Sequence, residues 1–228
     1  MRLHRFFVNF LIEHTKTTIK DEKLIHQWRD VFRYNIGSEV ILFDGSGNEY
    51  DSVIEKMNNR EAEVRLVSER KGIVPDKKIT LYQSLIKKDK MEWVVEKATE
   101  LGVYKIIPII SERSEKKSFN LERAKKIAIE ASEQCGRADV PVLECIMGLE
   151  ECIMDERGEK IIFDQTGEPF SFFVIHNTYP ISLFVGPEGG WTEKELEMFK
   201  NANAKIYSLG KLILRAETAA IVAISKFS

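Results

Sequence analysis

The chain has 228 residues, of which 43% are hydrophobic, and its formal net charge is −2 at pH 7. This composition supports a sizeable core in one large domain or two small ones, and it excludes a protein that binds nucleic acid through a global excess of positive charge. The N-terminal stretch MRLHRFFVNFLIEH lacks the apolar segment and cleavage site of a signal peptide, and no apolar run is long enough for a membrane span.

The local composition carries more information than the total charge. Basic side chains gather in residues 73–126 and acidic ones in residues 127–228. This distribution allows a local anionic partner, although a solvated helix face is the commoner cause. The three cysteines form no Cys-x-x-Cys pair, which argues against a disulfide framework and favours a reducing cytoplasm. No cluster of His and Cys has metal-ligand spacing, so no metal is expected.

Residues 1–72 are predicted to form a small, mostly β domain. Alternating apolar and polar residues, separated by Asp, Gly and Asn turn signals, predict strands over 39–44, 49–57 and 60–69. A short helix is expected over 21–33. A small β-barrel or a curled sheet accommodates these elements.

Residues 73–228 begin in a linker, KGIVPDKK, and then alternate between strands and helices. Strands are predicted at 79–86, 105–110, 160–165, 182–187 and 204–210, and helices at 91–102, 121–136, 192–202 and 216–227. Asn120 is the expected cap of the second helix, and Gly102 ends the first. This order predicts an α/β domain with a parallel sheet, in which ligands bind at the carboxyl ends of strands.

The stretch FVGPEGGWTEKE joins an apolar strand to a helix through a loop with three glycines. Thr192 and Glu195 have the spacing of a capping box. A glycine loop before a helix usually favours phosphate, but a carboxylate on Glu188 would repel it. Neither nucleotide-binding spacing, GxxxxGK[ST] or GxGxxG, is present. The expected ligand therefore tolerates a negative neighbour.

The stretch SLGKLILRAETAAIVA places Arg215, Glu217 and Thr218 at the start of an almost wholly apolar helix. One interpretation is an Arg–Glu pair that caps a structural helix. The other is a polar helix start in a ligand cleft, with the apolar body of the helix in a core or an interface.

These two stretches, together with MRLHRFF, ISERS and EQCGR, resemble the RsmE family. Its members are SPOUT-superfamily RNA methyltransferases that methylate N3 of a uridine in small-subunit (16S) ribosomal RNA. The resemblance covers nearly the whole chain, and the motifs occur in the family's order. It implies a PUA-like RNA-binding domain over 1–72 and a trefoil-knotted methyltransferase domain over 73–228. It also implies a cytoplasmic homodimer paired through the knot.

The resemblance further implies S-adenosyl-L-methionine as the cofactor. Its expected binding residues are Phe184, Gly186, Pro187, Gly189, Leu209, Gly210, Leu214, Ala216 and Thr218. N3 of uracil is a weak nucleophile until it loses its proton, so Arg215 is expected to stabilise the anionic base. Glu217 or Glu188 is expected to take the proton or to orient Arg215, and the sequence does not choose between them.

The RNA substrate is expected either as free small-subunit RNA or as the assembled subunit. The residues expected to contact it are Arg2, His4, Arg5, Arg113, Lys116 and Arg137. The alternatives are an N-terminal strand partly in the core and lysines on a solvated surface. Three other functions stay open: a non-catalytic ribosome-associated RNA-binding factor, a SPOUT methyltransferase of another RNA nucleotide, and a generic nucleotide-binding enzyme.

Overall fold

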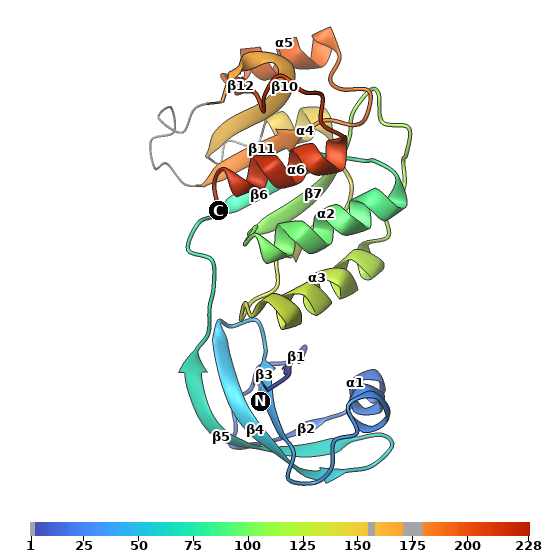
Figure 1. Cartoon of the computed structure of the whole chain (residues 1–228), viewed down its shortest axis with the longest axis vertical. Coiled ribbons are helices and arrows are strands. Elements are labelled where there is room, and N and C mark those ends of the chain that lie inside the picture. The colour runs from blue at the N-terminus through green and yellow to red at the C-terminus, as the bar shows by residue number, and fades with distance from the viewer. Residues whose placement is uncertain (1–2, 155–157, 171–179) are drawn as a thin grey trace. The chain divides into compact units, whose positions relative to one another are not determined.

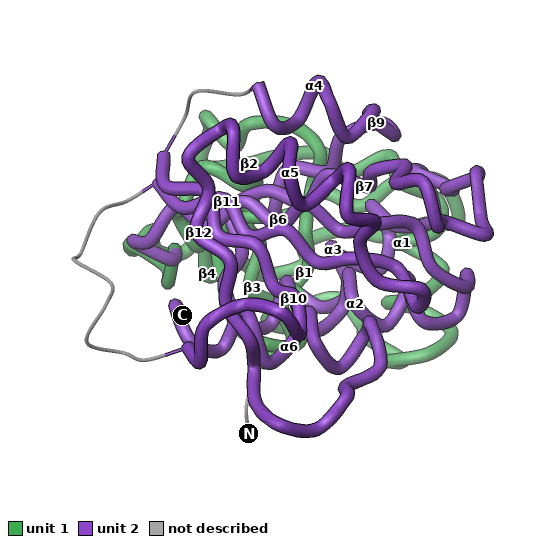
Figure 2. Tube along the Cα trace, turned by 90° about the horizontal axis from the view of Figure 1, so that it is seen from above, with its two compact units in different colours: residues 1–74, 132–140 green, residues 75–131, 141–228 purple. Residues whose placement is uncertain are grey.

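The computed structural model describes residues 3–154, 158–170 and 180–228. The chain divides into two compact units, which are coloured separately in Figure 2. The first unit comprises residues 1–74 and 132–140, and the second comprises residues 75–131 and 141–228.

The segment 132–140 differs from the expected division, which assigned it to the second domain. Backbone and side-chain contacts explain its place in the first unit. The amide of Phe7 donates to the Glu133 carboxylate at 2.9 Å, and the amide of Ala138 donates to the Ile73 carbonyl at 2.7 Å. Such long-range contacts have no signature in local sequence.

The first unit contains a five-stranded sheet. Its strands are β1 (Arg5–Phe7), β2 (Lys16–Ile19), β3 (Glu39–Phe43), β4 (Asn48–Met57) and β5 (Ala62–Lys71), in the order β1-β3-β4-β5-β2. Strands β1 and β3 are parallel, and the other pairs are antiparallel. The β4–β5 register shifts twice, and such bulges bend strands, which produces the curled form of the expected small β domain (Figure 1).

The core of the first unit forms between this sheet and a short helical stretch. The expected helix over 21–33 is an α-turn, α1 (Glu22–His26), followed by a π-helical turn, η1 (Gln27–Val31). The Asp21 carboxylate caps α1 by accepting from two backbone amides. Trp28, which is fully buried, packs edge-on against Phe6 at a centroid distance of 5.4 Å.

The second unit contains an entirely parallel sheet. Its strands are β6 (Ile79–Ser84), β7 (Lys105–Ile110), β8 (Val142–Leu143), β9 (Met147–Gly148), β10 (Glu159–Pro169), β11 (Ile181–Val185) and β12 (Lys205–Ser208). The order is β12-β10-β11-β6-β7-β8, with β9 also paired to β7. The alternating strands and helices therefore form the predicted parallel α/β domain, and the short elements between 140 and 160 are additional to the prediction.

Helices cover this sheet on both faces (Figure 1). They are α2 (Lys88–Glu100), α3 (Leu121–Cys135), α4 (Leu149–Ile153), α5 (Glu193–Asn201) and α6 (Ala216–Ser225). Their ends follow the predicted signals: Gly102 has φ +80 after α2, and Asn120 Oδ1 accepts from the Arg123 amide at 3.0 Å. Among the described residues, no helix is long and apolar enough to cross a membrane.

The path of the chain after β12 determines where the ligand-binding loops meet. Strand β12 lies at the sheet edge beside β10, whereas α6 packs against α2 and against the central strands β11 and β6. The segment 209–215 must therefore pass the carboxyl ends of β10 and β11 to reach α6. This return path is compatible with the expected knot, and it brings three strand-end loops together.

Candidate active site

The loops after β10, β11 and β12 enclose a cavity of about 550 Å³ at the carboxyl edge of the sheet. It is lined by residues 163–165, 185–188, 190–191, 208–210, 212–217 and 219, together with Lys87 and Lys90. All of them belong to the second unit. The volume lies in the usual range for small-molecule sites, about 300–1,000 Å³.

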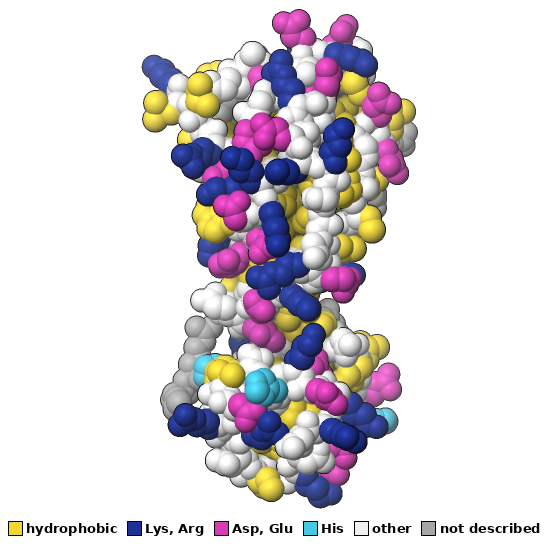
Figure 3. Space-filling view, turned by 90° about the vertical axis from the view of Figure 1, so that its right-hand side faces the viewer, with side chains coloured by type: hydrophobic (Ala, Val, Ile, Leu, Met, Phe, Trp, Pro, Cys, Tyr) yellow, Lys and Arg dark blue, Asp and Glu magenta, His cyan; other side chains and the backbone are white. Residues whose placement is uncertain are grey.

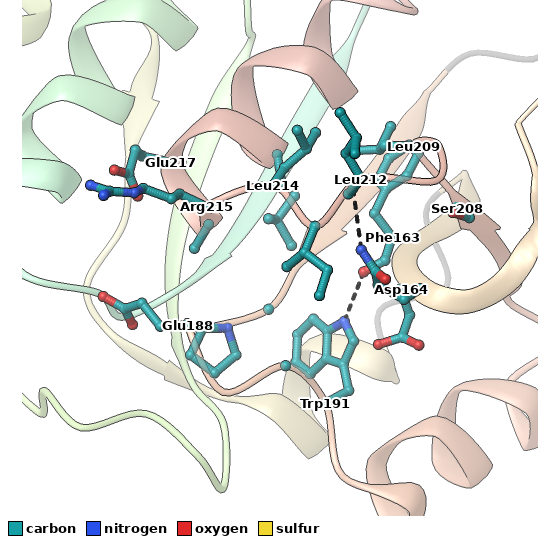
Figure 4. A pocket seen from close by; sticks show the side chains of 18 of the residues that line it. Phe163, Asp164, Glu188, Trp191, Ser208, Leu209, Leu212, Leu214, Arg215 and Glu217 are labelled. Atoms are coloured by element: carbon teal, nitrogen blue, oxygen red, sulfur yellow. Dashed lines mark hydrogen bonds between the residues drawn. The ribbon is translucent and has the colours of Figure 1, made fainter.

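A bulge in β10 provides one wall. Both Phe163 and Glu168 pair with Tyr207 of β12, so the residues between them leave the ladder and Asp164 and Gln165 face the cavity. Gln165 Nε2 donates to the Leu212 carbonyl at 3.3 Å, which ties the bulge to the loop after β12 (Figure 4). Burial raises the pKa of the Tyr207 hydroxyl above its ordinary value.

The glycine loop after β11 provides another wall. Gly190 has φ +67, a conformation that favours glycine. The predicted capping box is confirmed: the Thr192 amide donates to Glu195 Oε2 at 2.8 Å, and the Glu195 amide donates to Thr192 Oγ1 at 3.2 Å. Trp191 packs in the core and also lines the cavity, and its Nε1 donates to the Phe163 carbonyl at 3.2 Å.

Arg113 holds the glycine loop from the neighbouring segment after β7. Its Nη1 donates to the carbonyl oxygens of Gly189, at 2.8 Å, and Trp191, at 3.2 Å. A Cβ on Gly189 would lie 3.2 Å from Arg113 Cβ, so the absence of a side chain permits this close approach. The Glu112 amide adds a bond to Glu195 Oε1 at 2.8 Å. The sequence predicted an RNA contact for Arg113, whereas the structure places its guanidinium on the loop that lines the cavity.

Arg215, Glu217 and Glu188 lie at one end of the cavity, which we call the charged end. Figure 4 shows Arg215, Glu217 and Glu188 on one side, and Asp164 and Trp191 on the other. Arg215 is the exposed N-cap residue of α6, and no side-chain hydrogen bond of its own caps that helix.

Glu217 is 8% exposed, and its carboxylate lies 3.5 Å from the Lys90 ammonium. Within the described residues it thus pairs with Lys90 rather than forming the Arg–Glu cap that the sequence left open. Glu188 is exposed and accepts a long bond, 3.4 Å, from the Lys87 amide.

The expected cofactor residues divide into two groups. Those that line the cavity are Gly186, Pro187, Leu209, Gly210, Leu214 and Ala216. Phe184, Gly189 and Thr218 are not part of the lining. The ring of Phe184 is fully buried and stacks on Tyr82 at 4.3 Å, so this side chain supports the strand instead. Lys90 and Trp191 line the cavity without a signal in the sequence, because only the folded chain brings them to the three loops.

The expected RNA contacts in the first unit have different surroundings. Arg2 lies outside the described residues, and His4 is exposed with its ring 4.4 Å from that of Phe32. The Arg5 side chain is 9% exposed, forms an ion pair with the buried Glu49, and donates to the Arg137 carbonyl at 3.0 Å.

Arg137 is 3% exposed and makes two bonds of 2.8 Å to the Asp139 carboxylate. The guanidinium groups of Arg5 and Arg137 therefore have partners inside the first unit, and their contact with RNA stays a prediction. The buried Glu49 carboxylate needs a positive partner, and Arg5 provides one. Lys116, in the second unit, is exposed, which is compatible with both an RNA contact and a solvated surface.

The fold and the cavity define an α/β enzyme of the RNA methyltransferase class. Residues 74–228 match a family model described as an RNA methyltransferase domain, and residues 29–67 match one described as an RNA methyltransferase PUA domain. The chain belongs to the RsmE family of SPOUT-type RNA methyltransferases.

Relatives of known name and structure cover nearly the whole chain. The Ribosomal RNA small subunit methyltransferase E of Rickettsia conorii is 33% identical over 99% of this chain and 95% of its own length. The crystal structure of the enzyme of that name from Neisseria gonorrhoeae, bound to S-adenosyl methionine, is 31% identical with a TM-score of 0.87, covering 98% of this chain and 96% of that one. A methyltransferase of Legionella pneumophila in complex with the same cofactor is 28% identical with a TM-score of 0.91, covering 99% of this chain and 96% of that one.

Proposed function

We propose that this protein uses S-adenosyl-L-methionine to methylate N3 of a uridine in small-subunit ribosomal RNA. The observation that carries the proposal is the cavity formed by the loops after β10, β11 and β12, with Arg215, Glu217 and Glu188 at one end. Membership of the RsmE family supports the methyl transfer and the class of RNA. The choice of N3 of uracil rests on the resemblance to that family, and the chemistry of the charged end is compatible with it.

The residues of the cavity fit S-adenosyl-L-methionine better than a nucleoside polyphosphate. Leu209, Leu214 and Trp191 give apolar walls, and the glycine loop exposes backbone groups that can bond to an adenosine. Glu188 belongs to the same loop and lines the cavity. Its carboxylate repels phosphate but is compatible with a cationic sulfonium and an amine. When bound, the cofactor supplies an activated methyl group.

The charged end of the cavity suits a base that must lose a proton. Arg215 is exposed and its guanidinium is available to the carbonyl oxygens beside N3, where it stabilises the anionic ring. Lys90 adds a second cation, held 3.5 Å from Glu217. The exposed Glu188 is the carboxylate better placed to accept the proton, because Glu217 is buried in its ion pair.

The proposal includes a homodimer in the cytoplasm. Leu212 and Ile213, in the segment before α6, are 80% and 85% exposed, although both are large aliphatic residues. Ile221 and Val222 of α6 are only half-buried. A second copy of the second unit would cover such a surface.

The test is a methyl-transfer assay followed by identification of the product. Small ribosomal subunits that lack the modification are incubated with the protein and S-adenosyl-L-methionine labelled in the methyl group. The expected product is 3-methyluridine in a digest of the RNA. Label in another nucleoside would show that the acceptor is not N3 of uridine. Calorimetric binding of the cofactor, with ATP and NAD as controls, is expected to be saturable. Absence of both binding and transfer would favour a non-catalytic RNA-binding factor.

A further inference from the structure

We propose that a second cavity in the methyltransferase unit binds a nucleotide of the RNA other than the one that is methylated. This inference rests on the proposed function and extends its substrate site. The cavity has a volume of about 520 Å³ and lies between the beginnings of α2 and α3. It is therefore nearly as large as the cavity described above, which has a volume of about 550 Å³.

The two cavities are neighbours along the chain. Lys87 and Lys90 line the first cavity, and Ile86, Lys88 and Met91 line the second. The segment 86–91 therefore forms a wall of both. A strand of RNA whose target base enters the first cavity is thus brought to the mouth of the second, where a neighbouring base can be splayed out.

The floor of the second cavity is apolar and suits the flat face of a base. Ile86, Met91 and Ala124 are at most 3% exposed. Phe119, from the segment before α3, lines the same cavity and is half-buried, so part of its ring is accessible. Single-stranded RNA is commonly recognised by stacking of unpaired bases on such aromatic side chains.

The rim of the cavity is charged. Its carboxylates are paired with other side chains, so one ammonium group of the rim is available to bind a phosphate. Glu92 pairs with Arg123 at 3.4 Å and with Lys88 at 3.8 Å. The second carboxylate of the lining, on Glu122, pairs at 3.1 Å with a lysine one turn further along α3. Lys116 is exposed and, in the described part of the chain, has no ion-pair partner.

An aromatic face beside an unpaired ammonium matches a nucleotide, which presents a base and a phosphate together. Figure 3 looks onto the edge where α2 and α3 begin, and in the second unit it shows Lys and Arg side chains beside hydrophobic ones. RNA is the occupant that uses both features of this cavity.

The experiment compares matched variants of the full-length protein in methyl transfer to unmodified small ribosomal subunits. Phe119→Leu removes the aromatic face, and Phe119→Tyr keeps it. Lys116→Ala removes a charge from the rim, whereas Lys117→Ala removes one from the next residue, which is exposed and lies outside the lining. The quantities measured are kcat, KM for the subunit, its dependence on salt, and the Kd of S-adenosyl-L-methionine. Light scattering gives the molar mass of each variant.

Phe119→Leu is expected to raise KM for the subunit roughly tenfold, and Phe119→Tyr to retain the original value, since one stacked base contributes on that scale. Lys116→Ala is expected to raise KM several-fold and to reduce the salt slope by about 1, as for the loss of one phosphate contact. Lys117→Ala and all values of cofactor Kd should stay unchanged.

Unchanged KM for the subunit in both Phe119→Leu and Lys116→Ala would overturn the proposal. Lys116 is exposed, so its variant still tests the proposal if the Phe119 variant folds poorly. A change in molar mass would also overturn it, since the occupant would then be a second copy of the chain. An inactive wild-type protein is a different outcome, which refutes the proposed function and this inference with it.

Discussion

Arg113→Ala is expected to weaken binding of S-adenosyl-L-methionine about tenfold, although Arg113 does not line the cavity. Its guanidinium donates to the carbonyl oxygens of Gly189 and Trp191, and these two bonds help to hold the glycine loop to the segment after β7. Without them the loop samples other conformations, and the ligand must order it on binding.

The magnitude follows from these two bonds. A hydrogen bond to a charged group contributes roughly 1.5–3 kcal/mol where it is shielded from water. Arg113 is exposed, so each bond is discounted toward the ~0.2–1 kcal/mol of surface pairs. The two together then contribute about 1–2 kcal/mol, which corresponds to roughly 5–30-fold in Kd.

The assay is calorimetric titration of the cofactor into Arg113→Ala, with Lys117→Ala as a control that removes one positive charge from the same segment. Far-ultraviolet circular dichroism checks that the fold is retained. An unchanged cofactor Kd would refute the reasoning. If KM for the ribosomal subunit rises instead, the RNA contact that the sequence predicted for Arg113 is the better interpretation.

Three further variants test other contacts. Arg215→Ala should lower kcat by roughly two orders of magnitude, the loss typical of one charge-stabilising donor, while calorimetry gives an unchanged cofactor Kd; full activity would remove its catalytic role. Thr192→Ala should lower the free energy of unfolding by about 1 kcal/mol through loss of the capping box, measured by urea denaturation. Arg5→Met should destabilise the protein by about 2 kcal/mol, less than for a carboxylate left wholly unpaired, because Arg70 still lies 2.8 Å from Glu49; unchanged stability would mean that Arg70 suffices.

Local signals in the sequence predicted the elements of the second unit well. The apolar strands, the capping box at Thr192 and the cap at Asn120 all depend on residues close together in the chain, and the structure confirms them. The short pieces β8, β9 and α4 carry too little periodicity to be predicted.

Contacts between distant residues were beyond local reasoning. Arg113 and Gly189 are far apart in the sequence, and nothing in the motif ISERS indicates that its arginine bonds to a glycine loop. The pairing of Glu217 with Lys90 and the place of residues 132–140 in the first unit depend in the same way on packing. The resemblance supplied the family and the cavity-lining loops, but not which charged groups are already paired.

The path of the chain after β12 has a consequence for the order in which the protein becomes active. The cavity needs the loop 208–215 and the start of α6, which close it against strands made much earlier. During synthesis the strands that precede β12 can pair while these residues are still inside the ribosome, so a nascent chain can be largely folded and yet unable to bind its methyl donor. Cofactor binding therefore requires that the segment 208–215 has docked. Incomplete chains that lack it cannot methylate ribosomal RNA.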